Sequence, residues 1–317
     1  MKHADIIQTL DLEQKCALLS GGTVFDTRAL PGKNVPSITL SDGPNGVRKQ
    51  AGAADHLGLN PSVPATCFPT SATVANSWDP ALGEAVGEAM GEEAAAQEVS
   101  VLLGPGLNIK RSPLCGRNFE YFSEDPYLAG KMAAAYVRGI QKNGIAACPK
   151  HFAVNSQELR RMASDSIVDE RTLREIYLTG FEMVVKEAQP KTIMSAYNLV
   201  NGTYANENAH LLMEILRRDW GFDGAVVTDW GGSNDHALGV KNGSTLEMPA
   251  PGGDAIRELM KAVQTGKITE ADVDARLEEL LELVFTTKAA VDAAPGKFDA
   301  DAHHALARRA AAQSIVL

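Results

Sequence analysis

Short apolar runs alternate with longer stretches of helical periodicity along this chain, from about residue 36 to about residue 287. Each short run is nearly continuous in apolar or β-branched residues, as in strands of a parallel sheet that is buried on both faces. The predicted strands cover residues 36–40, 99–103, 144–148, 192–196, 225–227 and 245–248. The predicted helices cover residues 5–19, 79–98, 127–142, 170–187, 210–218, 253–265 and 269–287, with a further helix after Asp235.

Local signals mark some of these boundaries and the loops between them. Asp79 and Pro80 match the N-cap and the first position of the helix that follows. The polar segments 108–126 and 155–168 contain no clear helix or strand. Loops of this length inside a compact domain are usually functional. Residues 50–66 are rich in Ala, Gly and Pro and predict a surface excursion.

The order of the elements predicts the fold class. Strand and helix alternate at least five times, and a polar loop follows each strand. This alternation indicates a mostly parallel sheet, and a length of 317 residues favours a TIM-like (β/α)8 barrel over an open doubly wound sheet. In such a barrel the loops after the strands meet at one face, where α/β barrels place their chemistry.

Composition and charge exclude several classes of function. The chain holds 30 basic and 40 acidic residues, and a net charge of −10 argues against non-specific binding to nucleic acid or to an anionic membrane. A hydrophobic content of 44% is enough for a sizeable core. No run approaches the roughly 20 apolar residues of a membrane helix. Residues 1–12 lack the apolar core of a signal peptide.

The cysteine, glycine and histidine patterns give no support for a bound cofactor. The four cysteines are scattered without a Cys-x-x-Cys pair, which predicts free thiols in a reducing, cytoplasmic compartment. No Gly-x-Gly-x-x-Gly opens a helix, and no Walker sequence is present. No spacing of His, Cys and carboxylates matches a zinc site.

The segment around Asp229 holds the clearest candidate chemistry. The predicted strand 225–227 leads directly to this carboxylate, at the position where barrel enzymes carry catalytic groups. Trp230 supplies a flat apolar wall of the kind that a sugar ring packs on, and the pair Gly231-Gly232 lets the chain turn away sharply. The alternative interpretation is a strand that ends in an ordinary Asx turn.

Polar side chains also follow the other predicted strands, namely Asp42, Arg117, Glu120, Lys150, His151, Arg161 and Tyr197. In a barrel these groups converge on one face, where carboxylates, cationic donors and aromatic rings together suit a neutral polyol such as a sugar. Two alternatives stay open, because Lys150 and His151 could simply cap a strand and the arginines could form a solvated charge run. Glu247 is a rival carboxylate that ranks below Asp229.

Several motifs occur in a fixed order along essentially all of the chain. They are SDGPNGVR at 41–48, GPGLNI at 104–109, GRNFE at 116–120, SEDP at 123–126, KHF at 150–152, Arg161, MSAYN at 194–198 and VTDW at 227–230. Together they resemble glycoside hydrolase family 3, and in particular its β-glucosidases with two major domains. Each motif alone would be weak, but the ordered set is highly specific.

This resemblance implies that Asp229 is the nucleophile of a retaining mechanism. Its carboxylate attacks the anomeric carbon and forms a covalent glycosyl-enzyme, which water then hydrolyses. The resemblance places Asp42, Arg117, Lys150, His151, Arg161 and Tyr197 around the non-reducing-end sugar, with Trp230 lining the pocket. We expect the nearby cations to favour the ionised form of Asp229. The resemblance implies no metal and no organic cofactor.

A retaining enzyme also needs an acid/base, which lies roughly 5–5.5 Å from the nucleophile when both are carboxylates. In the two-domain members of the family this glutamate comes from the second domain. We therefore predict a catalytic barrel over residues 1–290 and a linker over residues 291–317, which leads to an α/β domain outside this chain. The acid/base would come from that domain or from a complementary chain.

Single-domain relatives of about this length act on N-acetylglucosaminides and carry a second histidine in a Lys-His-Phe-Pro-Gly-His-Gly pattern. Residues 150–157 here read Lys-His-Phe-Ala-Val-Asn-Ser-Gln, without that histidine. The motif therefore favours a β-glucosidase that hydrolyses terminal non-reducing β-D-glucosyl residues. A β-xylosidase or N-acetyl-β-glucosaminidase of the same family and a non-catalytic sugar-binding barrel are the alternatives.

Overall fold

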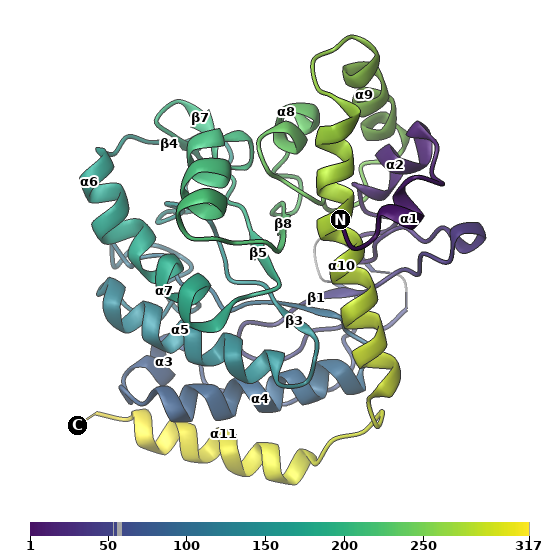
Figure 1. Cartoon of the computed structure of the whole chain (residues 1–317). Helices are drawn as coiled ribbons and strands as arrows, with labels where there is room; N and C mark the ends of the chain where they lie inside the picture. The colour runs from purple at the N-terminus through teal and green to yellow at the C-terminus, as the bar shows by residue number, and fades with distance from the viewer. Residues whose placement is uncertain (53, 56–58, 317) are drawn as a thin grey trace.

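In the computed structural model, described over residues 1–52, 54–55 and 59–316, short central strands are surrounded by helices (Figure 1). The strands are β1 (Leu40–Asp42), β2 (Val101–Leu103), β3 (Ala146–Ala147), β4 (Asp165–Ser166), β5 (Thr192–Met194), β6 (Leu199–Val200), β7 (Thr203–Tyr204) and β8 (Ala225–Val227). Part of the surface excursion predicted at 50–66 (residues 53 and 56–58) and the last residue of the predicted linker 291–317 lie outside the described residues.

The helices include eleven α-helical segments among the described residues. They are α1 (Ala4–Ile7), α2 (Leu12–Leu18), α3 (Ser71–Ala75), α4 (Pro80–Ala96), α5 (Pro126–Gln141), α6 (Glu170–Thr172), α7 (Thr179–Ala188), α8 (His236–Lys241), α9 (Gly253–Gln264), α10 (Glu270–Ala293) and α11 (Ala300–Ser314). Two 3₁₀ segments, η1 (Pro31–Lys33) and η3 (Ala205–Glu207), and two π-helical segments, η2 (Leu173–Leu178) and η4 (His210–Asp219), complete the set.

Strands β1, β2, β3, β5 and β8 form a wall of parallel neighbours, whereas β4, β6 and β7 form a separate small sheet in which β6 and β7 are antiparallel. β1, β2 and β3 pair in that order, and β5 pairs with β8. Single parallel bridges extend the wall: Phe152 with Ser195 joins the end of β3 to β5, and Val227 with Leu246 and Ser20 with Glu247 continue beyond β8. An antiparallel bridge joins Asp26 to Thr39, the residue directly before β1. The predicted TIM-like (β/α)8 barrel is thus confirmed, in an irregular form.

The two faces of this wall bury different apolar clusters, because successive side chains of a strand point to opposite faces. Leu102 and Val226 join the cluster that contains the apolar faces of α4, α5 and α7. Leu40 and Val227 join the cluster that contains apolar residues of α2, α9 and α10. Asp42 and Asp229 each follow one of these latter residues by two positions, so both carboxylates lie on the same face of the wall.

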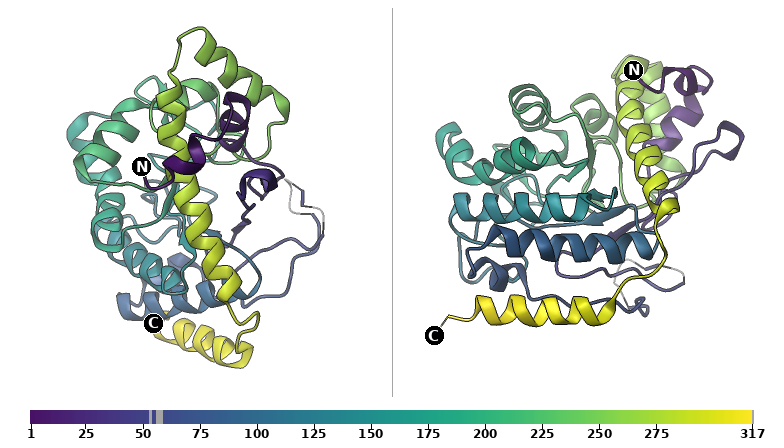
Figure 2. Two further views of the ribbon diagram at one scale, coloured as in Figure 1. Left: turned by 45° about the vertical axis from the view of Figure 1, so that its right-hand side comes forward. Right: turned by 60° about the horizontal axis from the view of Figure 1, so that its bottom comes forward.

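Helix packing is closest between α4 and α5, where glycine permits the contact. A Cβ atom on Gly87 would lie 2.5 Å from the carbonyl oxygen of Tyr136, a distance that real Cβ atoms do not show. Helix α11 runs along the outside of α4, far from α9 (Figures 1 and 2), and His303 ties it there through a 2.7 Å contact with the buried Glu93. The tail 300–314 is therefore packed against the barrel.

Several element boundaries differ from the predictions for local reasons. The predicted helix 5–19 is broken into α1 and α2, because Asp11 forms a capping box with Gln14 and begins a new helix. The first strand begins at Leu40 and includes Asp42, whereas it was predicted over 36–40. The predicted strand 245–248 makes single bridges through Leu246 and Glu247.

Candidate active site

Strand β8 delivers Asp229 to the carboxyl end of the wall, where it is only 8% exposed. Its Oδ1 atom accepts a 2.8 Å hydrogen bond from the backbone N–H of Trp230. Its Oδ2 atom is buried and has no hydrogen-bond partner among the described residues. A buried carboxylate oxygen without a partner is costly and therefore rare, and here it provides a free nucleophilic atom.

His151 lies beside that free oxygen, with Nε2 3.6 Å from Oδ2 of Asp229. Burial, followed by the charge of Arg117, holds the pKa of His151 well below its ordinary value, so the ring is neutral. Arg117 donates to Nε2 at 2.9 Å, which requires Nε2 to be the acceptor and places the ring proton on Nδ1. Nδ1 in turn lies 3.1 Å from the Tyr121 hydroxyl. The contact between His151 and Asp229 is therefore neither an ion pair nor a hydrogen bond.

Arg117, Glu120 and Lys150 form a buried charge cluster next to His151. Arg117 donates two hydrogen bonds to the carboxylate of Glu120, from Nε to Oε2 at 2.7 Å and from Nη2 to Oε1 at 3.0 Å. Lys150 approaches the same carboxylate at 3.2 Å. Burial acts to raise the pKa of Glu120, but the two cations outweigh it and lower that pKa to about 2. Glu120 is thus a fixed anion that orients two cationic donors toward the pocket.

A second set of contacts links the loop 155–168 to Trp230, the residue that follows Asp229. Arg161 donates to Oε2 of Glu158 at 2.6 Å, and its guanidinium carbon lies 4.6 Å from the centre of the Tyr197 ring. The Tyr197 hydroxyl donates a 2.7 Å hydrogen bond to the carbonyl oxygen of Trp230. Burial first, and then the charge of Asp229, raises the pKa of Tyr197, so the phenol keeps its proton.

The electrostatics of Asp229 differ from the expectation drawn from its neighbours. Arg117, Lys150 and Arg161 do lower its pKa, as does the N–H of Trp230. Burial has the larger effect, however, and the net pKa of Asp229 lies above its ordinary value. Sequence reasoning counted the cations correctly but had no measure of how little water reaches the carboxylate.

Asp42 lies at a pocket of about 490 Å³ that opens beside the charge cluster. Arg117, Glu120 and Lys150 line the same pocket, together with the loop 43–48, Cys67 and Phe119. Asp229 is not among its lining residues, and it is linked to the pocket through Arg117, which also reaches His151. Asp42 thus shares this pocket with Arg117 and Lys150, whereas Asp229 does not line it.

Trp230 is tied to the N-terminal segment. Its indole Nε1 donates a 2.7 Å hydrogen bond to the carbonyl oxygen of Val24. Its ring packs against Phe25, with centroids 5.4 Å apart and planes tilted by 40°. The ring is therefore held in one orientation next to the nucleophile, but it is not among the residues that line the 490 Å³ pocket.

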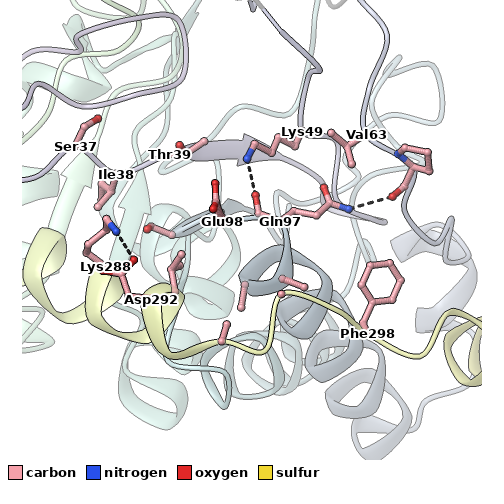
Figure 3. A pocket seen from close by; sticks show the side chains of 17 residues that line it. Ser37, Ile38, Thr39, Lys49, Val63, Gln97, Glu98, Lys288, Asp292 and Phe298 are labelled. Atoms are coloured by element: carbon pink, nitrogen blue, oxygen red, sulfur yellow. Dashed lines mark hydrogen bonds and ion pairs between the residues drawn. The ribbon is translucent and has the colours of Figure 1, made fainter.

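A larger cavity of about 870 Å³ lies at the other end of the wall, near the residues that precede β1 and β2 (Figure 3). Phe298 and the C-terminal ends of α4 and α10 line it (Figure 3). Its cations are engaged, because Lys49 donates to the carbonyl oxygen of Gln97 at 2.6 Å and Lys288 pairs with Asp292. Barrel enzymes place catalytic groups at the carboxyl ends of their strands, so we assign the candidate site to the smaller pocket.

Sequence reasoning overlooked three groups that shape this site. Asn108 accepts from the backbone N–H of His151 at 2.7 Å and donates to its carbonyl oxygen at 2.8 Å, which fixes this residue. Tyr121 holds the ring nitrogen Nδ1, and Glu158 pairs with Arg161. Asn108 stands in the motif 104–109, which follows the predicted strand 99–103, and that position was the available signal.

The described residues contain neither a cluster of metal ligands nor a membrane-spanning helix. No group of three or more His, Cys, Asp or Glu residues within ranges 1–52, 54–55 and 59–316 is arranged to hold a metal ion. In the same part of the chain, no helix combines the length and the apolar character needed to cross a membrane.

Comparison with known proteins gives a consistent result. The model of the "glycosyl hydrolase family 3 N terminal domain" matches residues 53–283. The thermostable beta-glucosidase B of Acetivibrio thermocellus is 51% identical over 98% of this chain and 41% of its own length. The exo-alpha-(1->6)-L-arabinopyranosidase of Bifidobacterium longum is 46% identical, with the same coverage of 98% and 41%.

Solved structures agree with the sequence matches. Beta-glucosidase 3B of Thermotoga neapolitana, in complex with glucose, superimposes with a TM-score of 0.93 at 38% identity. That match covers 99% of this chain and 47% of the other chain. The chain thus spans about two fifths of the length of the curated relatives it matches.

Proposed function

This chain belongs to glycosyl hydrolase family 3, and from that membership we propose that it is the catalytic N-terminal barrel of a retaining β-glucosidase. The observation that carries the proposal is the buried Oδ2 of Asp229, which has no hydrogen-bond partner among the residues that the structure describes and lies near cationic donors at the carboxyl end of the barrel strands. This arrangement suits a nucleophile that attacks a neutral sugar.

In the proposed first step, Oδ2 of Asp229 attacks the anomeric carbon of a β-glucoside. The bond from that carbon to the leaving oxygen breaks, and the leaving group accepts a proton from an acid. The carboxylate becomes an ester in the glycosyl-enzyme. Water then attacks the same carbon, gives up a proton to the conjugate base, and releases Asp229 as a carboxylate.

The groups around Asp229 have separate roles in the proposal. Lys150, Arg117 and Arg161 donate to sugar hydroxyls, because each keeps a cationic head close to the pocket or the nucleophile. Asp42 accepts from hydroxyls at the pocket mouth. His151 orients the guanidinium of Arg117 by accepting from it at Nε2, and Trp230 forms the apolar wall. Tyr197 keeps the backbone after the nucleophile in place through its bond to Trp230.

We propose that the acid/base comes from a second domain or from a complementary chain, since the relatives are more than twice as long. The proposed boundary of the catalytic barrel is residue 290, within the last turns of α10. The four cysteines are unbonded, which supports a reducing, cytoplasmic setting. Without the acid, the chain should favour aryl glucosides whose phenols leave without protonation, because general acid help is worth about 10²–10⁴-fold.

A second candidate substrate follows from the relatives. An α-L-arabinopyranosidase is 46% identical to this chain, which is close to the 51% of the β-glucosidase. We propose to compare aryl β-D-glucoside, β-D-xyloside, N-acetyl-β-D-glucosaminide and α-L-arabinopyranoside as substrates. The highest kcat/KM with the glucoside is the expected result, and a preference for any other would correct the substrate class.

The nucleophile is tested with 2,4-dinitrophenyl 2-deoxy-2-fluoro-β-D-glucoside. The electron-withdrawing fluorine slows hydrolysis of the glycosyl-enzyme, so the adduct accumulates and is found by intact and peptide mass spectrometry. We expect one fluoroglucosyl group on the peptide that contains Asp229, and none in Asp229→Asn. Glucose binding without any adduct would support a non-catalytic sugar-binding barrel instead, and an adduct on Glu247 would move the nucleophile to that rival carboxylate.

A further inference from the structure

The contacts around Asp229 close into a ring that passes through both long loops. In order, the ring runs from Asp229 to His151, Arg117, Glu158, Arg161, Tyr197, Trp230 and back to Asp229. Arg117 comes from the loop 108–126 and Arg161 from the loop 155–168. Glu158 is the member that joins these two arginines, so the ring is complete only through its carboxylate.

The two oxygens of Glu158 are engaged to different degrees. Oε2 accepts from Nη1 of Arg161 at 2.6 Å, which is a short, charge-assisted hydrogen bond. Oε1 lies 3.9 Å from Nη1 of Arg117, within ion-pair range but beyond a hydrogen bond. Oε1 is buried and has no hydrogen bond within the described ranges. The side chain is 26% exposed, and the two arginine side chains are 19% and 33% exposed.

The two arginines differ in how much other support they have. Arg117 is also held by Glu120 and by His151. Arg161 has the ring of Tyr197 beneath its guanidinium in addition to Glu158. Both lie near Asp229, since both lower its pKa. Two guanidinium ions on separate loops repel each other, and a carboxylate between them converts that repulsion into attraction.

We propose that Glu158 is a positioning residue of the sugar site, which holds Arg161 against Tyr197 and at a fixed separation from Arg117. Nothing in the described geometry makes Glu158 touch the reacting atoms. Its effect passes through Arg161 because that side chain has the fewer alternative supports. The inference deepens the proposed function, on which it rests for the identity of the ligand.

The role predicts a particular kinetic signature. Without its hydrogen bond to Glu158, Arg161 no longer holds its N–H donors toward the sugar hydroxyls. Binding of the sugar therefore weakens equally in the ground state and in the transition state. Asp229 keeps its bond to Trp230, so the attack itself changes little. Such a uniform loss of binding raises the inactivator constant and leaves the rate constant of the chemical step unchanged.

The experiment uses the dinitrophenyl fluoroglucoside with the whole 317-residue chain. The rate of adduct formation is measured against probe concentration for wild type, Glu158→Gln, Arg161→Ala and the double variant. We expect Glu158→Gln to raise the inactivator constant by about 10- to 100-fold, the usual value of a hydrogen bond to a charged group. The maximal inactivation rate should change by less than about threefold.

The double variant decides whether Glu158 acts through Arg161. In the Arg161→Ala background, Glu158→Gln should add less than about twofold, because the two changes remove the same interaction. If Glu158→Gln raised the inactivator constant as much in the Arg161→Ala background as in wild type, the inference would be overturned. An unchanged inactivator constant in Glu158→Gln alone would also overturn it. Glu175→Gln is the matched control, because it breaks an arginine–carboxylate pair that is largely exposed on a helix.

Two further outcomes separate the inference from the proposed function. If wild type forms no adduct, the proposed function fails, and the inference is decided by the ¹⁵Nε–H NMR signal of Arg161. That signal should be sharp and slow to exchange in wild type and averaged in Glu158→Gln, and equal signals would overturn the inference. Rescue of Glu158→Ala turnover by azide would identify Glu158 as the acid/base and overturn the positioning role.

Discussion

Replacing Glu120 by glutamine removes one charge from the most buried charge cluster of the site. The carboxylate accepts from Arg117 at 2.7 and 3.0 Å and from Lys150 at 3.2 Å, and it is only 4% exposed. Glutamine keeps the shape and one acceptor oxygen, but it leaves two neighbouring cations without their anion. Breaking a buried pair from one side is strongly destabilising for this reason.

The lowered pKa of Glu120 sets the size and the pH window of the effect. The pKa is about 2 in the folded state against 4.5 for an ordinary glutamate. Since one pKa unit corresponds to about 1.4 kcal/mol, the ionised carboxylate stabilises the fold by about 3 kcal/mol at neutral pH. The folded-state pKa is the lower one, so this contribution is complete above pH 4.5 and is lost as the pH falls toward 2.

Urea unfolding followed by circular dichroism measures this effect for wild type and Glu120→Gln. We expect the variant to lose about 3 kcal/mol at pH 7, and the gap to narrow progressively below pH 4.5. Glu175→Gln, in its exposed pair with Arg171, should match wild type throughout. If Glu120→Gln and wild type unfold at the same urea concentration at pH 7, the ionised Glu120 does not stabilise the fold.

Three further predictions follow from the site. Burial and Arg117 keep His151 neutral, so ¹⁵N NMR should show one Nδ1–H tautomer from pH 8 to pH 5, and a titration in that range would contradict the assignment. Cys67 is exposed at the pocket, so iodoacetamide should label it and glucose should slow the reaction, whereas Cys148, buried with a pKa raised to about 12, should stay unlabelled. Burial raises the pKa of Glu247 to about 7 from 4.5, so the folded state binds more protons between these values and stability falls as the pH rises. The free energy of unfolding of Glu247→Gln relative to wild type, measured with urea, should therefore rise by up to about 3 kcal/mol between pH 4 and pH 7. A difference that stays constant with pH would show that the side chain is not buried as described.

Residues within one element were the easiest part to predict. The strand 225–227 and the N-cap at Asp79 agree with the structure, because apolar runs and cap residues act over a few positions of the chain. The predicted first strand was displaced from 36–40 to 40–42, since its pairing partner lies in β2, more than fifty residues away. The predicted helix 5–19 failed at Asp11, where a local capping box outweighed the apolar periodicity.

The residues of the site were also predictable only in part. Arg117, Lys150 and His151 could be singled out because each follows a strand and stands in a recognisable motif. The importance of Glu158 could not be seen, because a single glutamate between Gln157 and Leu159 in a loop has no distinctive pattern. Its significance arises only when the loop 155–168 folds back and places the carboxylate between two arginines.

The chain order of strands, helices and polar strand ends was enough to predict the barrel class, and the ordered set of motifs was enough for the resemblance to the family, since both depend on local stretches of sequence. Tertiary structure alone decided that Asp229 has a raised pKa despite three cations, and that its Oδ2 has no hydrogen-bond partner in the described part of the chain. The physical reason is that desolvation and charge separation depend on distances between loops that are remote in sequence, and such distances exist only once the chain has folded.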